Sequence, residues 1–169
     1  MSYCGVMSQE MEKESTVQES EVKGLVMFVG EYVYALDPKK RLTIPSVWRA
    51  QLEPKRSFYV LPDLHEQCLI LYPGDEFMRK LEKLRQYGMR DKQAMRFASI
   101  LGASSDLVTW DTQGRIRIKD KLLQFAGLTK QVVLVGALNK IELWNPEIRP
   151  EQKTVDQNLL REVSKFVDF

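Results

Sequence analysis

Two arginines, Arg41 and Arg115, each follow an aspartate by four residues, and both lie in segments rich in basic residues. Lysine and arginine neutralise phosphates and release condensed counterions, and arginine also pairs with the edges of guanine. The chemistry that these residues could perform is therefore binding to double-stranded DNA. The residues that we expect to contact DNA are Lys39, Lys40, Arg41, Arg115, Arg117 and Lys119.

Each Asp-x-x-x-Arg segment is short enough to be a turn between two strands. Asp37 and Asp111 can shape these turns by accepting hydrogen bonds from the turn's own N–H groups. Gly114 can adopt a positive φ freely, whereas Lys40 at the equivalent position would cost about 1–2 kcal/mol. Each arginine can either pair with its own aspartate or project from the turn, and both arrangements are compatible with the sequence.

Alternation along a strand places Arg115, Arg117 and Lys119 on one face, while Ile116 and Ile118 face the core. A two-stranded ribbon with such a cationic face fits the major groove of DNA. One basic hairpin would be weak support for this function, because runs of charge are usually solvated surfaces. Two hairpins at matching positions strengthen the interpretation.

The two motifs belong to an internal repeat with an offset of 74 residues between Asp37 and Asp111. The same offset aligns two apolar stretches, and a two-residue gap aligns a third block. The aligned blocks are 37–44 with 111–118, 58–61 with 132–135, and 69–72 with 141–144. Each repeat is predicted to form two strands, a short helix and two further strands, which is a ββαββ unit.

Helical spacing predicts the short helix of each unit. The first begins near Pro45, ends at Pro54 and buries Trp48 and Leu52. We expect the second helix to be buried through Leu122 and Phe125 and to be capped by Gly127. In the first unit Pro45 occupies the position that Lys119 occupies in the second.

Further helices are predicted between and after the two units. Asp75 and Asp91 can each cap a helix of the insert, the first ending at Gly88 and the second near Leu101. Residues 155–169 are predicted to form a C-terminal helix that packs on the body or on a neighbour. The apolar residues at helical spacing are Phe77, Leu81 and Leu84 in the insert and Leu159, Val163 and Phe166 near the end.

The net charge of +2 is too small to indicate a partner, but the charge is unevenly distributed. Residues 1–22 carry a net charge of −4, residues 37–56 carry +4 and residues 111–130 carry +3. We expect residues 1–26 to form a mobile acidic leader. No apolar run of about 18 residues and no secretory signal is present, so we expect a cytoplasmic protein without a membrane partner.

Residues that could support catalysis or bind a metal are scarce. His65 is the only histidine and lies in a predicted surface loop, and Cys4 and Cys68 are expected to be free thiols. No clustered metal ligands and no phosphate-binding glycine loop are present. An enzyme is therefore the weakest hypothesis, and we expect neither a cofactor nor a metal.

The chain resembles the MraZ family over most of its length, from about Met27 to Pro150. The doubled Asp-x-x-x-Arg pattern is the most specific mark of the resemblance. The matching segments are 27–32, 37–45, 111–115, 132–136 and 141–144. Lys40, which replaces the usual turn glycine, and Lys119 depart from the family pattern. Residues 1–26 precede the family's usual start, so we expect translation to begin at Met27, which an intact-mass measurement would test.

The resemblance implies an α+β, β-rich fold of two AbrB/SpoVT-type units in one chain, joined as a swapped-hairpin barrel. We expect units at 27–77 and 105–150, a helical insert at 78–104 and a C-terminal helix or tail at 151–169. The resemblance further implies a ring-like homo-oligomer at the nucleoid that binds direct repeats in DNA. The implied role is repression at the promoter of the cell-division and cell-wall gene cluster.

Two other functions are compatible with the sequence. The first is an AbrB-like antitoxin, which would bind a toxin protein as well as DNA, although such antitoxins usually carry one unit and a disordered tail. The second is a protein-interaction module, which predicts no salt-dependent affinity for DNA.

Overall fold

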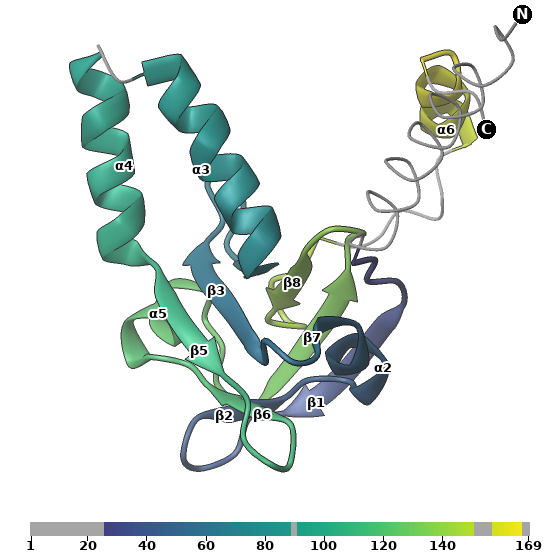
Figure 1. Cartoon of the computed structure of the whole chain (residues 1–169). Helices are drawn as coiled ribbons and strands as arrows, with labels where there is room; N and C mark the ends of the chain where they lie inside the picture. The colour runs from purple at the N-terminus through teal and green to yellow at the C-terminus, as the bar shows by residue number, and fades with distance from the viewer. Residues whose placement is uncertain (1–25, 89–90, 151–156, 167–169) are drawn as a thin grey trace, which may run out of the picture.

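A computed structural model describes residues 26–88, 91–150 and 157–166, and Figure 1 shows the arrangement of its elements. The expected acidic leader, apart from Val26, lies outside the described residues, as does Cys4. Helices and antiparallel strands both contribute to the fold, so the α+β class is confirmed.

The elements follow the order predicted from the repeat. The first series is β1 (Glu31–Ala35), β2 (Arg41–Thr43), α2 (Ser46–Arg49) with the short 3-10 helix η1 (Ala50–Leu52), β3 (Ser57–Pro62) and β4 (Leu69–Pro73). The second series is β5 (Asp106–Thr109), β6 (Arg115–Arg117), α5 (Asp120–Phe125), β7 (Gln131–Gly136) and β8 (Ile141–Trp144). Strands β6 and β7 begin and end 74 residues after β2 and β3, which is the offset of the sequence repeat.

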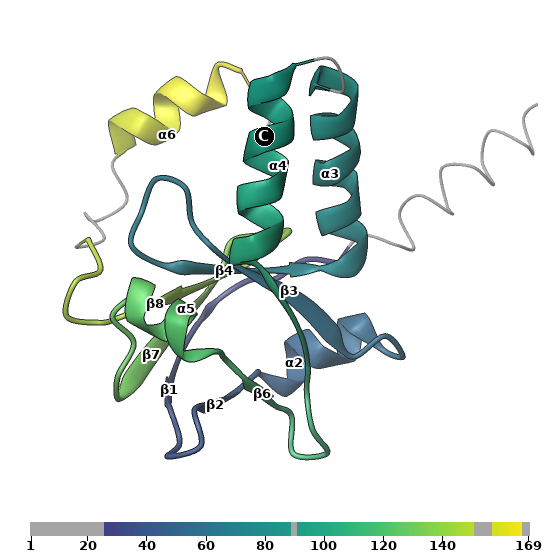
Figure 2. The same cartoon turned by 90° about the vertical axis from the view of Figure 1, so that its left-hand side faces the viewer.

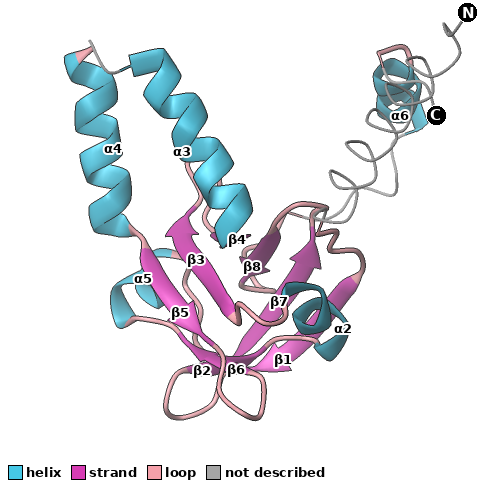
Figure 3. Cartoon of the chain, viewed as in Figure 1, coloured by secondary structure: helices cyan, strands magenta, loops and turns pink. Residues whose placement is uncertain are grey.

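The two series are interleaved rather than placed side by side. The strand order of the larger sheet is β1-β7-β8-β4-β3-β5, with antiparallel neighbours throughout. The first strand of each series therefore pairs with the third strand of the other series, β1 with β7 and β5 with β3. Strands β2 and β6 pair with each other in a separate two-stranded ribbon, visible among the magenta strands in Figure 3.

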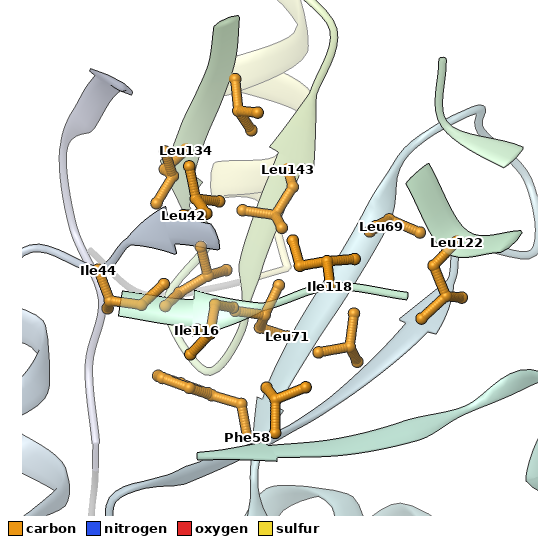
Figure 4. Close-up of a cluster of buried hydrophobic side chains, with 14 of the residues drawn as sticks. Leu42, Ile44, Phe58, Leu69, Leu71, Ile116, Ile118, Leu122, Leu134 and Leu143 are labelled. Carbon is orange, nitrogen blue, oxygen red and sulfur yellow. The ribbon is translucent and has the colours of Figure 1, made fainter. Parts of the chain in front are cut away.

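A single large apolar cluster joins the ribbon to the sheet. Leu42 and Ile44 from one series and Ile116 and Ile118 from the other are all completely buried, and they point into the cluster shown in Figure 4. The predicted alternation along β6 is therefore confirmed, because Ile116 and Ile118 are buried while Arg117 is exposed. Burial of this inner row positions the opposite row toward solvent.

The short helix of the first series agrees with its prediction. Pro45 is the residue that precedes α2, and Trp48 and Leu52 are buried. The indole Nε1 of Trp48 donates a hydrogen bond to the carbonyl oxygen of Val29 at 3.1 Å, so its polar atom is satisfied. The helix is thereby held against the sheet beside β1.

In the second series, the prediction that Phe125 is buried was wrong. Helix α5 begins at Asp120 and buries Leu122, Leu123 and Ala126, whereas Phe125 is 41% exposed. The buried stripe follows positions i, i+1 and i+4, which places Phe125 away from the core. Gly127 follows with φ +61, and its N–H and that of the next residue bond to carbonyls of the last helical turn, which confirms the predicted cap.

The helical insert projects from the sheet, at the end of the molecule opposite the ribbon (Figures 1 and 2). It consists of α3 (Gly74–Gly88) and α4 (Lys92–Ser104). Asp91 caps α4 as predicted, because its side chain accepts a hydrogen bond from the Gln93 N–H. Asp75 lies inside the first turn of α3 instead of capping it, and it pairs with Lys55. Within α3, Phe77 is buried, and Leu81 and Leu84 are half-buried.

Helix α6 (Gln157–Ser164) lies within the predicted C-terminal helix. Val163 and Phe166, which we expected to pack on the body or on a neighbour, are 47% and 88% exposed in this chain. None of the helices in the described ranges is long and apolar enough to cross a bilayer. Cys68 is a buried free thiol, and burial raises its pKa to about 12.

Candidate nucleic-acid interface

The two Asp-x-x-x-Arg turns lie at the two ends of one ribbon, because the strands that follow them pair antiparallel. In the β2–β6 ribbon, Arg41 stands opposite Arg117, Leu42 opposite Ile116, and Thr43 opposite Arg115. Since Leu42 and Ile116 face the core, the other four side chains lie on the outer side. We call this outer side, together with the turns at 37–41 and 111–115, the hairpin face (Figure 2).

The backbones of the two turns are alike. In the first, the Asp37 N–H donates to Arg41 O at 3.0 Å, and the Lys40 N–H donates to Asp37 O at 2.9 Å. In the second, the Asp111 N–H donates to Arg115 O and the Gly114 N–H donates to Asp111 O, both at 2.9 Å. These bonds close a tight loop at each end of the ribbon.

The aspartates hold the turns together through their side chains as well. Asp37 Oδ1 accepts from the Arg41 N–H at 2.8 Å, and Asp111 Oδ1 accepts from the Arg115 N–H at 3.0 Å and the Gln113 N–H at 2.9 Å. For Asp111, hydrogen bonds from the Arg115 side chain and backbone lower the pKa to about 2. For Asp37, desolvation raises the pKa, but hydrogen bonds from Arg41 outweigh it and the pKa is lowered.

Both arginines pair with their own aspartates, which decides between the two arrangements that the sequence left open. Arg41 donates from Nε to Asp37 Oδ2 at 2.7 Å. Arg115 donates to Asp111 Oδ2 from Nε at 3.0 Å and from Nη2 at 2.8 Å. Their side chains are 29% and 25% exposed, so the guanidinium groups lie along the face rather than extend freely from its tips.

The remaining cations predicted to contact DNA differ in their pairing. Lys40 pairs with Asp120 at the start of α5, and Lys119 pairs with Asp106 at the start of β5. Lys39 and Arg117 are exposed, and within the described part of the chain neither side chain has a hydrogen bond or ion pair. The structure thus brings all six predicted residues to one end of the molecule.

Sequence reasoning missed a seventh cation. Arg49, at the end of α2, lies against Gly114 of the second turn, and its Nε donates to Ile44 O at 2.9 Å. Arg49 contributes to the positive charge of residues 37–56, but no local motif connects it with a turn that lies 65 positions further along the chain. Only the pairing of β2 with β6 brings the two together.

The hairpin face keeps an excess of positive charge after this pairing. Together with the neighbouring Arg49, Lys119, Asp106 and Asp120, the hairpin face has seven cationic side chains and four carboxylates, so three positive charges are left without a partner among the described residues. These three are Lys39, Arg49 and Arg117. An exposed surface of this kind attracts a polyanion, and the attraction weakens as salt screens it.

An apolar hollow lies elsewhere, between the helical insert and the β3–β4 loop. It has a volume of about 400 Å³, and His65 is one of the residues that line it. His65 is exposed in the loop, as predicted. None of the residues that line this hollow belongs to the hairpin face. The helical insert lies at the end of the molecule opposite the ribbon (Figure 1).

Comparison with known proteins identifies the same family over most of the chain. The family described as "MraZ protein, putative antitoxin-like" matches residues 27–99 and 101–149. A protein of Clostridium acetobutylicum named "Transcriptional regulator MraZ" is 31% identical over 138 residues, which cover 80% of this chain and 95% of that protein. Proteins of the same name from Thermomicrobium roseum and Clostridium beijerinckii are each 36% identical over 121 residues, which cover 72% of this chain and 83% of each relative.

Proposed function

This chain belongs to the MraZ family of transcriptional regulators, and from that membership we propose that it binds double-stranded DNA sequence-specifically to regulate transcription. The relatives carry the name of a regulator rather than of an enzyme, and we assign no catalytic step and no cofactor to this chain. The hairpin face is the surface that binds the DNA.

One observation carries the proposal. Arg41 and Arg117 stand directly opposite each other in the β2–β6 ribbon, on its solvent side. Like charges directly opposite in a ribbon destabilise it, and Asp37 compensates only one of the two guanidinium groups. A bound polyanion supplies the missing negative charge, and a two-stranded ribbon has the width to enter a major groove.

The pairing of the arginines supports this role by fixing their orientation. Asp37 accepts a side-chain hydrogen bond from Arg41 only at Nε. Neither terminal nitrogen of Arg41 has a hydrogen bond within the described residues. Asp111 holds Arg115 through Nε and Nη2. A guanidinium held in one position loses less conformational freedom when it binds. Arg41, Arg115 and Arg117 then contact bases or phosphates, while Lys39, Lys40 and Lys119 contact the DNA backbone.

The swapped arrangement of the strands supports a closed body. The β2–β6 ribbon connects by tight turns to β1 and β5, which are the two edge strands of the larger sheet. We infer that the ribbon closes the sheet into a swapped-hairpin barrel. The units at 27–77 and 105–150 then fold together, because each pairs strands with the other, and 78–104 is an insert in that body.

The family likeness supports the wider setting of the proposal. In this setting the protein acts in the cytoplasm at the nucleoid, as a ring-like homo-oligomer that binds direct repeats. It represses the promoter of the cell-division and cell-wall gene cluster. A ring would multiply weak single contacts, because each bound subunit raises the effective concentration of the next at the neighbouring repeat.

The proposal is tested by titrating the protein with DNA from upstream of its own gene at several salt concentrations. The variants are Arg41→Ala, Arg115→Ala and Arg117→Ala, with Arg96→Ala on α4 as a control of equal charge change. We expect the three hairpin variants to bind more weakly and the control to bind like the parent. Equal affinity in all five proteins would contradict the proposal, and so would an affinity that does not change with salt.

A further inference from the structure

Arg49 lies against Gly114 in the turn of the second hairpin, and no contact with DNA has been assigned to it so far. It ends α2, and its Nε donates a hydrogen bond to the carbonyl oxygen of Ile44 at 2.9 Å. The N–H of Ile44 in turn donates to the carbonyl oxygen of Gly114 at 2.9 Å. Two consecutive hydrogen bonds therefore connect this guanidinium with the β5–β6 turn.

The absence of a side chain at Gly114 makes room for Arg49. A Cβ atom built on Gly114 would lie 2.7 Å from Nη2 of Arg49 and closer still to its Cζ. Gly114 also has φ +76, a conformation that glycine adopts without penalty. This glycine therefore serves both the backbone of the turn and the placement of the guanidinium.

The charge of Arg49 has no counterpart in the described part of the chain. The side chain is half-buried, and its only hydrogen bond there is the one from Nε to Ile44, so its terminal nitrogens are available. A partly desolvated cation without a carboxylate is costly, and an incoming anion offsets that cost. The planar group offers parallel N–H donors, the arrangement that suits a phosphate.

The first hairpin has no equivalent arginine. The residue at the position equivalent to Arg49 is Leu123, and the one equivalent to Gly114 is Lys40. Lys40 carries its charge on the turn itself, where Asp120 pairs with it. Each hairpin thus has a cation near its turn, Lys40 in the first and Arg49 in the second. Of these two, only Arg49 has no carboxylate partner among the described residues.

We propose that Arg49 binds a backbone phosphate of DNA beside the β5–β6 turn, with Gly114 giving its guanidinium access to that position. This assignment rests on the proposed function, since it requires that the hairpin face binds DNA. It adds to the face a contact that comes from a helix rather than from either strand of the ribbon.

The test measures how binding depends on salt for two duplexes, one from upstream of the gene and one of random sequence. A residue that contacts a phosphate contributes about 0.9 to the slope of log affinity against log salt concentration. We expect Arg49→Ala to weaken binding to both duplexes and to reduce the slope by about that amount. Arg49→Lys, which keeps the charge, should retain the slope, and Arg96→Ala on the distant α4 should leave both affinity and slope unchanged.

Gly114→Ala provides an independent check, because the new methyl group would displace the guanidinium. The double variant of Arg49→Ala and Gly114→Ala should reduce the slope of log affinity against log salt concentration by no more than Arg49→Ala alone does. The melting temperature of each variant is recorded, and if Arg49→Ala is poorly folded, Arg49→Gln is judged by the same slope.

The outcomes separate this assignment from the proposed function. A parent protein that binds neither duplex in a salt-dependent manner would overturn both. A parent that binds, together with folded Arg49→Ala and Arg49→Gln variants that keep the parent slope, would overturn the role of Arg49 alone.

Discussion

Lys40 and Gly114 occupy the same position in two turns of the same backbone geometry, with φ angles of +61° and +76°. In each turn the N–H of this residue donates to the carbonyl oxygen of the preceding aspartate at 2.9 Å. Glycine adopts this left-handed conformation freely, whereas a lysine there is strained by about 1–2 kcal/mol. The first hairpin therefore keeps its shape at a cost that the second does not have.

Replacing Lys40 with glycine should stabilise the protein. The relief of strain exceeds the extra entropy that glycine gains in the unfolded chain, so we expect a gain of up to about 1 kcal/mol in the free energy of unfolding, measured in urea. Asp120→Asn is the control for the lost ion pair with Lys40, and an exposed pair of this kind contributes less than about 1 kcal/mol. A Lys40→Gly protein that is no more stable than Asp120→Asn would contradict the strain at this turn.

Gly136 and Gly102 should respond in opposite ways to alanine. A Cβ on Gly136 would lie 2.6 Å from the backbone carbon of Phe28, and rigid backbone cannot move aside easily. We expect Gly136→Ala to lower the free energy of unfolding by about 1–3 kcal/mol. Gly102 lies within α4 with nothing near the new methyl group, so Gly102→Ala should raise stability by about 0.5–1 kcal/mol. Equal changes in the free energy of unfolding of the two variants would contradict the close contact between Gly136 and the backbone of Phe28.

The charge of Asp111 should make stability depend on pH in the acid range. Its pKa lies at about 2 in the folded protein, below its ordinary value of 3.8, because the side chain and the backbone N–H of Arg115 donate hydrogen bonds to it. A lowered folded-state pKa means that this stabilisation is complete above the unfolded pKa and is lost as the pH falls through the folded pKa. The stability difference between the parent and Asp111→Asn should therefore be constant above about pH 5 and shrink between about pH 4 and pH 2.

Urea unfolding of both proteins across this range is the measurement. Asp37→Asn should behave in the same direction, since the pKa of Asp37 is also lowered. If the difference in the free energy of unfolding between the parent and Asp111→Asn stays constant down to pH 2, the negative charge of Asp111 does not contribute to stability.

The order of the elements could be predicted from the sequence because the repeat and the alternation of apolar residues are local signals. The offset of 74 residues located β6 and β7, and alternation assigned Ile116 and Ile118 to the core. Alternation identifies which side of a strand is buried, but it does not identify the neighbouring strand. The pairing of β1 with β7 was therefore available only from the resemblance, which implied exchanged hairpins.

The site could be predicted in composition but not in geometry. Six cations were expected at the hairpins, and all six lie at one end of the molecule. Whether Arg41 and Arg115 pair with Asp37 and Asp111 depends on rotamers, which the spacing does not determine. Arg49 escaped prediction because its contact with Gly114 depends on the pairing of two strands from different repeats. Phe125 was misplaced because a helix of six residues leaves its rotational phase poorly specified.

The last prediction separates residues that read sequence from residues that hold the DNA backbone. Arg117 lies on the ribbon itself, opposite Arg41, and would face base edges in a major groove, whereas Lys39 lies on the turn. Arg117→Ala should reduce the preference for upstream DNA over random DNA by about 1–3 kcal/mol. Lys39→Ala should weaken binding to both duplexes alike and reduce the salt slope by about 0.9. Competition titrations with the two duplexes measure both effects, and a reversal of the two patterns would mean that the turns, not the ribbon, enter the groove.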